Sequence, residues 1–246
     1  MGSRGNAGLR ALADVANINE PPAAYHAGFL FGPRVNAGGR VGEAWLGAAL
    51  LSTEDSQRAD ELAQRLDGYN DERRSIEADC LQSAIEIIES SDHGNFVYVA
   101  SSEWHPGVIG IVAGRLREQF NCPACVVAYD GSKGRGSGRS VKGFDLGSTI
   151  VAARQAGLLA EGGGHPMAAG FSIQKKNERA FCEFVTERID NTKRQLNPVY
   201  RIDGVLQPIG ANNEFLSALE QLAPFGAGNP QPKFAFPKAR IVKAKP

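Results

Sequence analysis

A long amphipathic stretch over residues 54–90 is the clearest periodic pattern in the chain. Mostly apolar positions recur there at alternating steps of four and three, which is the spacing of one face of an α-helix: Leu62, Leu66, Tyr69, Arg73, Ile76, Cys80, Ala84 and Ile87. Residues 52–55 precede it as a helix N-cap with acidic side chains. The pattern predicts one helix of ~55 Å that connects two lobes.

Shorter patterns alternate between strand and helix after His93-Gly94. Strands are expected at residues 96–100, 125–129 and 168–173, and helices at 108–120, 145–157 and 177–195. This alternation predicts an α/β fold, with helices packed on a sheet. After Asn197-Pro198 the order changes to a strand at 199–206, a helix at 212–222 and a strand at 233–243. We therefore place a domain boundary near residue 197.

The segment before the long helix is less regular. Residues 6–16 and 22–31 are short apolar stretches that we expect to be helical, and residues 43–51 form a further short helix. Between them, residues 32–42 are rich in glycine and carry Arg34 and Arg40. Because glycine disfavours a regular helix, we expect this stretch to be a loop.

Glycine is the residue in which the composition departs from the average. The chain has 29 glycines in 246 residues, about 12% against a typical ~7%. Six lie between Gly28 and Gly47, and eleven lie between Gly131 and Gly170. Glycine is required where φ is positive or where a ligand approaches the main chain closely. The clusters predict backbone-lined binding loops, and tight turns alone are the alternative.

Charge and hydropathy exclude several classes of protein. The 27 basic and 27 acidic residues balance, which argues against a disordered acidic or basic tail. No apolar run approaches the ~20 residues of a membrane-spanning helix. The N-terminus has no apolar stretch of a secretion signal, so we expect a cytoplasmic protein without a membrane partner. The last residues have a strand pattern without closure, and we expect the chain to be a piece of a longer protein.

The four cysteines fit a reducing compartment. Cys122 and Cys125 have the spacing of a redox motif, but an apolar run follows them directly. A zinc site would need a second pair of ligands, and neither Cys80 nor Cys182 has a Cys or His close by in the sequence. We interpret all four as buried structural thiols, with redox or metal chemistry as the alternative.

Residues 131–140 alternate small residues with cations. No acidic residue interrupts the four cations of this region, Lys133, Arg135, Arg139 and Lys142. Small residues permit a close backbone approach, and arginine forks match phosphate oxygens. The spacing is neither that of a P-loop nor that of a dinucleotide fingerprint. The stretch predicts a phosphate-binding loop, and a solvated basic hairpin is the alternative.

Three consecutive glycines precede His165, which is followed by small residues that open a strand. The imidazole has little side-chain cover there, so we predict that it contacts a ligand. His105 lies at the start of a helix, where main-chain amides also bind anions, and it fits a cap or packing role equally well. His26 and His93 have no chemistry-bearing neighbours in the sequence, and we interpret them as structural.

Five motifs together resemble the RecJ family of single-stranded-DNA-specific exonucleases. Trp104-His-Pro-Gly-Val-Ile-Gly-Ile-Val-Ala-Gly-Arg115, Gly136-Ser-Gly-Arg-Ser140 and Gly162-Gly-Gly-His-Pro-Met-Ala-Ala-Gly170 resemble its DHH-associated domain. Residues 32–42 resemble its loop before the connecting helix, and residues 222–232 resemble the entry to its OB-fold domain. The matches run in the family's order over nearly the whole chain.

The resemblance implies a domain order. Residues 1–53 would be the tail of the DHH domain and a glycine/arginine loop, and residues 54–93 the connecting helix. Residues 94–197 would be the DHH-associated α/β domain, and residues 198–246 a partial OB-fold-like domain. It also implies a processive 5′→3′ exonuclease of recombination and DNA repair that uses Mn²⁺ or Mg²⁺. Its partners would be single-stranded DNA, a single-stranded-DNA-binding protein and a helicase.

Site roles follow from the same resemblance, at the matching positions only. Arg34 or Arg40, with Ser137 and Arg139, would hold the terminal 5′-phosphate. Gly163, Gly164 and His165 would contact the scissile phosphate or the nucleotide beside the metals, with His165 as the catalytic residue. The family holds its metals in an N-terminal DHH domain, whereas this chain has no Asp-His-His and only Asp92-His93 approaches it. We therefore expect no metal on this chain and no cleavage by it alone.

Two other functions stay open at this level. A related phosphodiesterase acting on short oligonucleotides or cyclic dinucleotides would share the glycine–histidine motif. The stretch at 32–42 and the OB-like entry argue against it. A non-catalytic nucleic-acid-binding or scaffold module would instead present the long helix to a partner, although apolar stripes more often pack inside their own chain.

Overall fold

The computed structural model describes residues 5–21, 23–90, 93–192, 200–226, 228–238 and 240. The α-helices are α1 (Ala7–Val15), α2 (Gly32–Val41), α3 (Leu46–Ser52), α4 (Ser56–Glu89), α5 (Ile109–Phe120), α6 (Leu146–Gln155), α7 (Glu178–Asn191) and α8 (Asn213–Glu220). The strands are β1 (Val97–Ser101), β2 (Ala124–Asp130), β3 (Lys133–Arg139), β4 (Glu161–His165), β5 (Ala168–Gln174), β6 (Gly204–Val205) and β7 (Phe234–Ala235). Short helical turns are η1 (His26–Phe31), η2 (Lys175–Asn177) and η3 (Pro208–Gly210).

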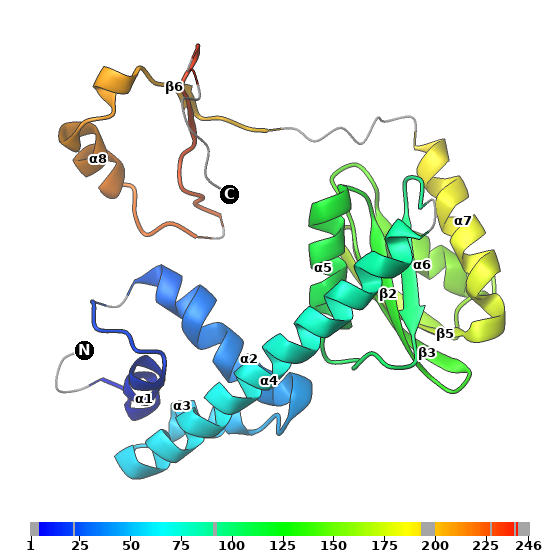
Figure 1. Cartoon of the computed structure of the whole chain (residues 1–246), viewed down its shortest axis with the longest axis horizontal. Helices are drawn as coiled ribbons and strands as arrows, with labels where there is room; N and C mark the ends of the chain where they lie inside the picture. The colour runs from blue at the N-terminus through cyan, green and yellow to red at the C-terminus, as the bar shows by residue number, and fades with distance from the viewer. Residues whose placement is uncertain are drawn as a thin grey trace.

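The predicted long helix is α4, and it does connect two parts of the chain. The carboxylate of Asp55 caps it by accepting hydrogen bonds from the amides of Gln57 at 2.9 Å and Arg58 at 3.2 Å. Figure 1 shows α4 running from α1, α2 and α3 to the sheet. Leu62 and Leu66 are buried among the N-terminal helices. Further along α4, Cys80, Ala84 and Ile88 are buried against α5 and the sheet.

Residues 32–42 are not the loop that we expected, because residues 32–41 form α2. Pro33 stands in its first turn, where the missing amide costs little. A Cβ on Gly38 would lie 2.5 Å from the carbonyl oxygen of Glu43, and one on Gly42 would lie 2.4 Å from the Tyr69 ring. The glycines therefore permit close contact with neighbouring backbone and with α4. This packing offsets a helix-propensity cost of about 1 kcal/mol per glycine.

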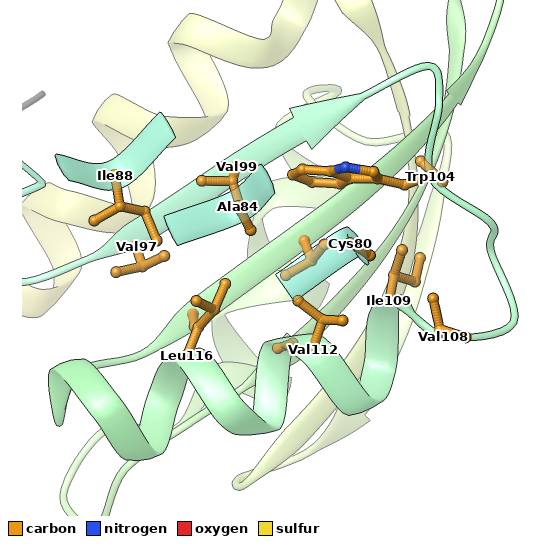
Figure 2. Close-up of a cluster of buried hydrophobic side chains, with 14 of the residues drawn as sticks. Cys80, Ala84, Ile88, Val97, Val99, Trp104, Val108, Ile109, Val112 and Leu116 are labelled. Atoms are coloured by element: carbon orange, nitrogen blue, oxygen red, sulfur yellow. The ribbon is translucent and has the colours of Figure 1, made fainter. Parts of the chain in front are cut away.

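Five strands form one sheet in the order β1-β2-β3-β5-β4. β1 and β2 are parallel, and the other neighbouring pairs are antiparallel. The α/β fold class is confirmed. α4 and α5 share a hydrophobic core with β1 and β2 on one face, shown in Figure 2 around Trp104 and Val112. α6 and α7 share a second core with the opposite face, around Phe171 and Phe181.

Two further glycine-rich stretches that we predicted as loops are strands. Residues 133–139 form β3 in the middle of the sheet, and residues 161–165 form β4 beside β5. A Cβ on Gly136 would lie 2.2 Å from the Phe171 ring, and one on Gly162 would lie 2.7 Å from Ile150. Neighbouring large side chains thus occupy the space that these residues leave free, so the glycines are required by packing and not by a turn.

The C-terminal residues form a smaller unit. β6 pairs in parallel with β7, and the Asn212 side chain caps α8 by accepting from the amide of Phe215 at 2.9 Å. Within the described residues, these strands are shorter than the predicted strands at 199–206 and 233–243. Residues 193–199 lie outside the described residues, and the predicted boundary near residue 197 falls there.

The four cysteines are free thiols, as interpreted from the sequence. Cys80, Cys122 and Cys125 are buried, and Cys182 is partly buried. Burial raises the pKa of the Cys80 and Cys182 thiols to about 12. Among the described helices, none combines the length and apolarity needed to cross a membrane.

Candidate functional site

Side chains of a strand alternate between the two faces of the sheet, so β3 places its glycines on one face and its polar residues on the other. Gly134, Gly136 and Gly138 face the α6–α7 side, where Cβ atoms would collide with buried side chains. Arg135, Ser137 and Arg139 alternate with them and therefore point to the opposite face. The sequence pattern that looked like a basic loop is thus one polar face of a central strand.

A cleft of about 730 Å³ opens over this polar face. Its walls come from the C-terminal end of α2, the residues that lead into α5, and strands β3, β4 and β5. The lining residues are Arg40, Pro106, Gly107, Ile109, Gly110, Arg135, Gly136, Ser137, Arg139, Glu161, Gly162, Gly163, Gly170, Phe171 and Ser172. Five segments of the chain therefore build one concave surface.

The floor of the cleft carries few side chains. The strand register places Ser137 beside Gly170, and Gly170 beside Gly163. Paired residues of neighbouring strands point to the same face, so this transverse row presents one hydroxyl and two glycines. A Cβ placed on Gly163 would meet nothing within 4 Å. A ligand can therefore approach the main chain of β5 and β4 directly.

Two rows of larger side chains flank the bare row. On one side the register aligns Arg135, Ser172 and Glu161. On the other side it aligns Arg139, Ala168 and His165. The floor is thus a shallow groove that runs across β3, β5 and β4. At its β3 end, Arg135 stands on one side and Arg139 on the other.

Arg139 is held in a defined position beside this floor. Its Nη1 donates to Ser137 Oγ at 3.1 Å and to the carbonyl oxygen of Gly138 at 2.9 Å. Burial lowers the pKa of the Arg139 guanidinium, and the positive charges of Arg40 and Arg117 lower it further. A guanidinium that is partly buried among like charges is stabilised by a bound anion.

Arg40 reaches the cleft from the end of α2. Its Nη1 donates to the carbonyl oxygen of Gly107 at 3.1 Å, just before α5 begins. Among the described residues, no ion pair involves Arg40, Arg135 or Arg139. These three arginines of the cleft are therefore not neutralised by a carboxylate within hydrogen-bonding distance in that part of the chain.

The N-terminal end of α5 borders the same floor. A Cβ on Gly110 would lie 3.0 Å from Ser137 Oγ and 3.1 Å from Arg139 Nη2, so only glycine permits this approach without displacement. The first amides of a helix point outward and carry a partial positive charge. Helix amides, arginine forks and a hydroxyl therefore converge on one small region, which is chemistry suited to phosphate oxygens.

Four of the residues predicted from the sequence come together in the cleft. Arg40, Ser137, Arg139 and Gly163 line it. Gly164 and His165 continue β4 beyond the lining, with His165 exposed in the transverse row of Arg139. His105 makes a local hydrogen bond, because its Nδ1 accepts from the amide of Gly107 at 3.0 Å.

Arg34 lies elsewhere. Its Nε pairs with Asp67 Oδ1 of α4 at 2.7 Å, and its Nη1 donates to the carbonyl oxygen of Leu30 at 3.0 Å. Its side chain is 14% exposed, and it does not line the cleft. Of the two arginines that the sequence left open, the geometry therefore brings only Arg40 to Ser137 and Arg139.

Arg135 was assigned from the sequence only to the basic stretch at 131–140, and Glu161, Gly170 and Ser172 were assigned no role, although all four line the cleft. Period-two alternation was the available signal, because Arg135 has the same parity as Ser137 and Arg139. Assigning residues 131–140 to a loop concealed that signal.

The described residues hold no group of three or more His, Cys, Asp and Glu side chains placed to bind a metal ion. In the cleft, Glu161 is the one carboxylate among the lining residues. Arginine, serine and glycine are not a donor set for a divalent cation, which prefers several carboxylate or imidazole ligands. This part of the chain is built for anions.

Comparison with known proteins matches the chain to two domain families. Residues 93–191 match the DHHA1 domain, and residues 202–246 match the RecJ OB domain. The single-stranded-DNA-specific exonuclease RecJ of Bacillus subtilis is 36% identical over 224 residues, which is 89% of this chain and 28% of that protein. The RecJ of Escherichia coli is 34% identical over 241 residues, which is 92% of this chain and 41% of that protein.

A solved structure agrees with these matches. The Thermus thermophilus RecJ in complex with Mg²⁺ superimposes with a TM-score of 0.79 and 30% identity, over 92% of this chain and 35% of that one. The chain thus spans well under half the length of these relatives. With both domain matches and the architecture agreeing along nearly its whole length, the chain belongs to the RecJ family, as a segment with the DHHA1 domain and the start of the OB domain.

Proposed function

We propose that this chain is the substrate-binding part of a 5′→3′ single-stranded-DNA exonuclease of recombination and DNA repair. The observation that supports this most directly is the cleft, where three arginines without carboxylate partners among the described residues surround a floor almost free of side chains. A strand with a negatively charged backbone fits such a groove, because guanidinium groups bind phosphates and the glycines admit the strand.

Arg40, Ser137 and Arg139 are the proposed holders of the terminal 5′-phosphate. Arg139 Nη1 and Ser137 Oγ are already 3.1 Å apart, so both donors can reach one phosphate without a large rearrangement. The row of Gly170 and Gly163 then receives the next part of the strand. A binding site that is organised before the ligand arrives loses less conformational entropy on binding.

Gly163, Gly164 and His165 are the proposed contacts of the scissile phosphate. β4 carries them at the edge of the sheet, on the far side of the floor from α5. We assign His165 a catalytic role as a donor to the phosphate being cleaved, where negative charge gathers in the transition state. Its exposure on this chain leaves the imidazole accessible to that phosphate.

Mn²⁺ or Mg²⁺ is the proposed cofactor of the whole enzyme, following RecJ structures that were solved with either ion. Such ions activate water and stabilise the charge on phosphate oxygens. The described residues do not fit them, and we propose that an N-terminal DHH domain, which this chain does not include, supplies the ligands. This chain alone would then bind the strand without cutting it.

The wider setting is proposed on the same grounds. We propose the domain division given above, apart from the loop at 32–42, and a cytoplasmic location. A single-stranded-DNA-binding protein and a helicase are the proposed protein partners, since a single strand must be exposed before it can be degraded from its end.

Binding of 5′-phosphorylated and 5′-hydroxyl oligo(dT) to this chain, measured by fluorescence anisotropy over a salt series, tests the proposal. The chain should bind the phosphorylated strand more tightly, and Arg139→Gln should weaken that binding about tenfold or more. The matched control is Arg179→Gln on α7, whose side chain is 91% exposed and paired with Glu183. Equal affinity of Arg139→Gln and the unaltered chain for both strands would contradict the proposal.

A further inference from the structure

A second group of arginines lies beside the cleft, along the contact between α4 and α5. We call it the seam, and it consists of Arg73 and Arg74 on α4 and Arg115 on α5, around Glu77. Arg73 Nη1 pairs with Glu77, and Arg115 Nε lies 3.5 Å from Glu77 Oε1. A single carboxylate thus serves two guanidinium groups from two helices.

Arg73 is incompletely satisfied in this position. Its side chain is 12% exposed, and its Nη2 donates to Asn70 Oδ1 at 3.0 Å. Its Nε is buried and has no hydrogen-bond partner within the described residues. A buried donor without a partner is destabilising, so its retention calls for a physical reason such as a bound ligand or ion.

The charges around Arg73 are unbalanced. Burial lowers the pKa of the Arg73 guanidinium, Glu77 opposes that shift, and the positive charges of Arg40, Arg74 and Arg115 add to it. Three neighbouring guanidinium groups therefore act on Arg73, and the carboxylate of Glu77 opposes them. An anion bound among them would relieve this repulsion.

Arg40 connects the seam to the cleft. It lines the cleft, and its charge acts on Arg139 on one side and on Arg73 on the other. The chain beside Arg40 is fixed to α4, because Val41 and Ile76 pack against the same hydrophobic core. Arg40 is therefore a charge that acts on both the cleft and the seam.

We infer that the seam is a second phosphate-binding position, which takes another phosphate group of the ligand whose first phosphate occupies the cleft. This inference rests on the proposed function. Arg74 and Arg115 are exposed and can contact the phosphate, with 59% exposure for the Arg115 side chain. Arg73 is a positioning residue that holds Glu77 and adds positive charge. The second phosphate belongs either to a 5′-terminal polyphosphate or to the backbone of a longer strand.

The test uses Arg74→Gln/Arg115→Gln in the full chain, since both side chains are exposed and their loss leaves the Arg73–Glu77 pair in place. Arg58→Gln is the matched control, an exposed arginine near the other end of α4 that pairs with Glu61. Anisotropy is measured for short and long oligo(dT), each with a 5′-monophosphate or a 5′-triphosphate, over a salt series.

The double variant should bind about three- to tenfold more weakly, and its slope of log K against log salt should fall by roughly 0.7 for each lost phosphate contact. A loss of affinity confined to the triphosphate strands assigns the seam to a terminal polyphosphate. A loss of affinity that grows with strand length assigns the seam to the backbone of the strand. Arg58→Gln should leave affinity and slope unchanged.

Failure of this inference is distinguishable from failure of the proposed function. In one outcome the double variant shows unchanged affinity and slope on all four strands while Arg139→Gln binds weakly. That result overturns the seam as a phosphate-binding position and leaves the proposed function of the cleft. Weak binding by the double variant with full binding by Arg139→Gln overturns the cleft, and with it the pairing of a cleft phosphate with a seam phosphate. Unchanged binding by both variants overturns both.

Discussion

Arg40 donates a hydrogen bond to the carbonyl oxygen of Gly107 at 3.1 Å, across 67 positions of sequence. The contact joins the end of α2 to the residues that lead into α5. A Cβ on Gly107 would lie 2.1 Å from the carbonyl oxygen of Arg40, so the two backbones also touch there. The N-terminal helices and the sheet domain thus meet at the wall of the cleft, and this junction sets where Arg40 lies relative to β3.

Substituting Gly107 with alanine should disturb this junction. The added methyl group has to displace main chain, so we expect a loss of about 1–3 kcal/mol in the free energy of unfolding. The shift of Arg40 should also weaken binding of a 5′-phosphorylated oligonucleotide. Urea unfolding and anisotropy measure the two effects.

Gly114→Ala is the control for that experiment. Gly114 lies within α5, and a Cβ there would meet nothing within 4 Å. Replacing a helical glycine by alanine should stabilise the chain by roughly 0.5–1 kcal/mol and leave binding unchanged. If Gly107→Ala behaves like Gly114→Ala, the junction does not position Arg40.

Arg34 and Arg40 should respond to substitution in opposite ways. Arg34→Ala leaves the partly buried Asp67 without its partner, so we expect about 1–3 kcal/mol less stability and unchanged binding by the folded chain. Arg40→Gln should bind the phosphorylated strand at least several-fold more weakly, with a stability loss of about 1 kcal/mol from the Gly107 contact. The reverse pattern would show that the 5′-phosphate reaches Arg34.

The long helix was predictable because its information is local. The apolar spacing and the acidic cap at Asp55 specify α4 within its own sequence, and tertiary contacts only select the face that is buried. At the end of α4 the structure differs from the predicted stripe, because Ile88 is buried and Ile87, which the pattern placed on the buried face, is exposed. On a helix of 3.6 residues per turn a seven-residue spacing drifts by about 20° per repeat, which adds up to most of one residue between Leu62 and Ile87.

The glycine-rich segments were not predictable in the same way. Intrinsic propensity favours a loop for α2, β3 and β4, and no neighbouring residue in the sequence contradicts it. Their glycines are required because groups far away in the sequence pack against them, such as Phe171 against Gly136 and Tyr69 against Gly42. Motif resemblance nevertheless selected Ser137, Arg139 and Gly163. It could not choose between Arg34 and Arg40, because that choice depends on where α2 meets the loop before α5.

Cysteine ionisation gives a prediction on pH. Burial raises the pKa of Cys80 to about 12, and the Glu77 charge adds to the rise. In the unfolded chain the same thiol ionises near pH 8.5. The contribution to stability is therefore fully present below about pH 8.5 and is lost as the pH rises toward 12. The urea midpoint should fall over this range, and Cys80→Ala should reduce the slope of that fall.

Alkylation followed by mass spectrometry checks the same point directly. At pH 8.5 iodoacetamide should modify the folded chain slowly, with the partly buried Cys182 ahead of Cys80, Cys122 and Cys125, and should modify the urea-unfolded chain at all four positions. Rapid modification of Cys122 and Cys125 in the folded chain would instead support the redox alternative.

Gly163 and Gly162 are neighbours on β4 with opposite surroundings, which makes them a matched pair for testing the floor of the cleft. Gly163→Val places a side chain where nothing lies within 4 Å, and the β-branched residue suits a strand. The free energy of unfolding should change by no more than about 0.5 kcal/mol. Oligonucleotide affinity should fall tenfold or more because the side chain fills the groove. Gly162→Ala forces a methyl group within 2.7 Å of Ile150 and should cost about 1–3 kcal/mol instead. Full binding by Gly163→Val would show that the strand does not cross the Ser137–Gly170–Gly163 row, and the phosphate contacts would then have to be sought along the flanking row of Arg135.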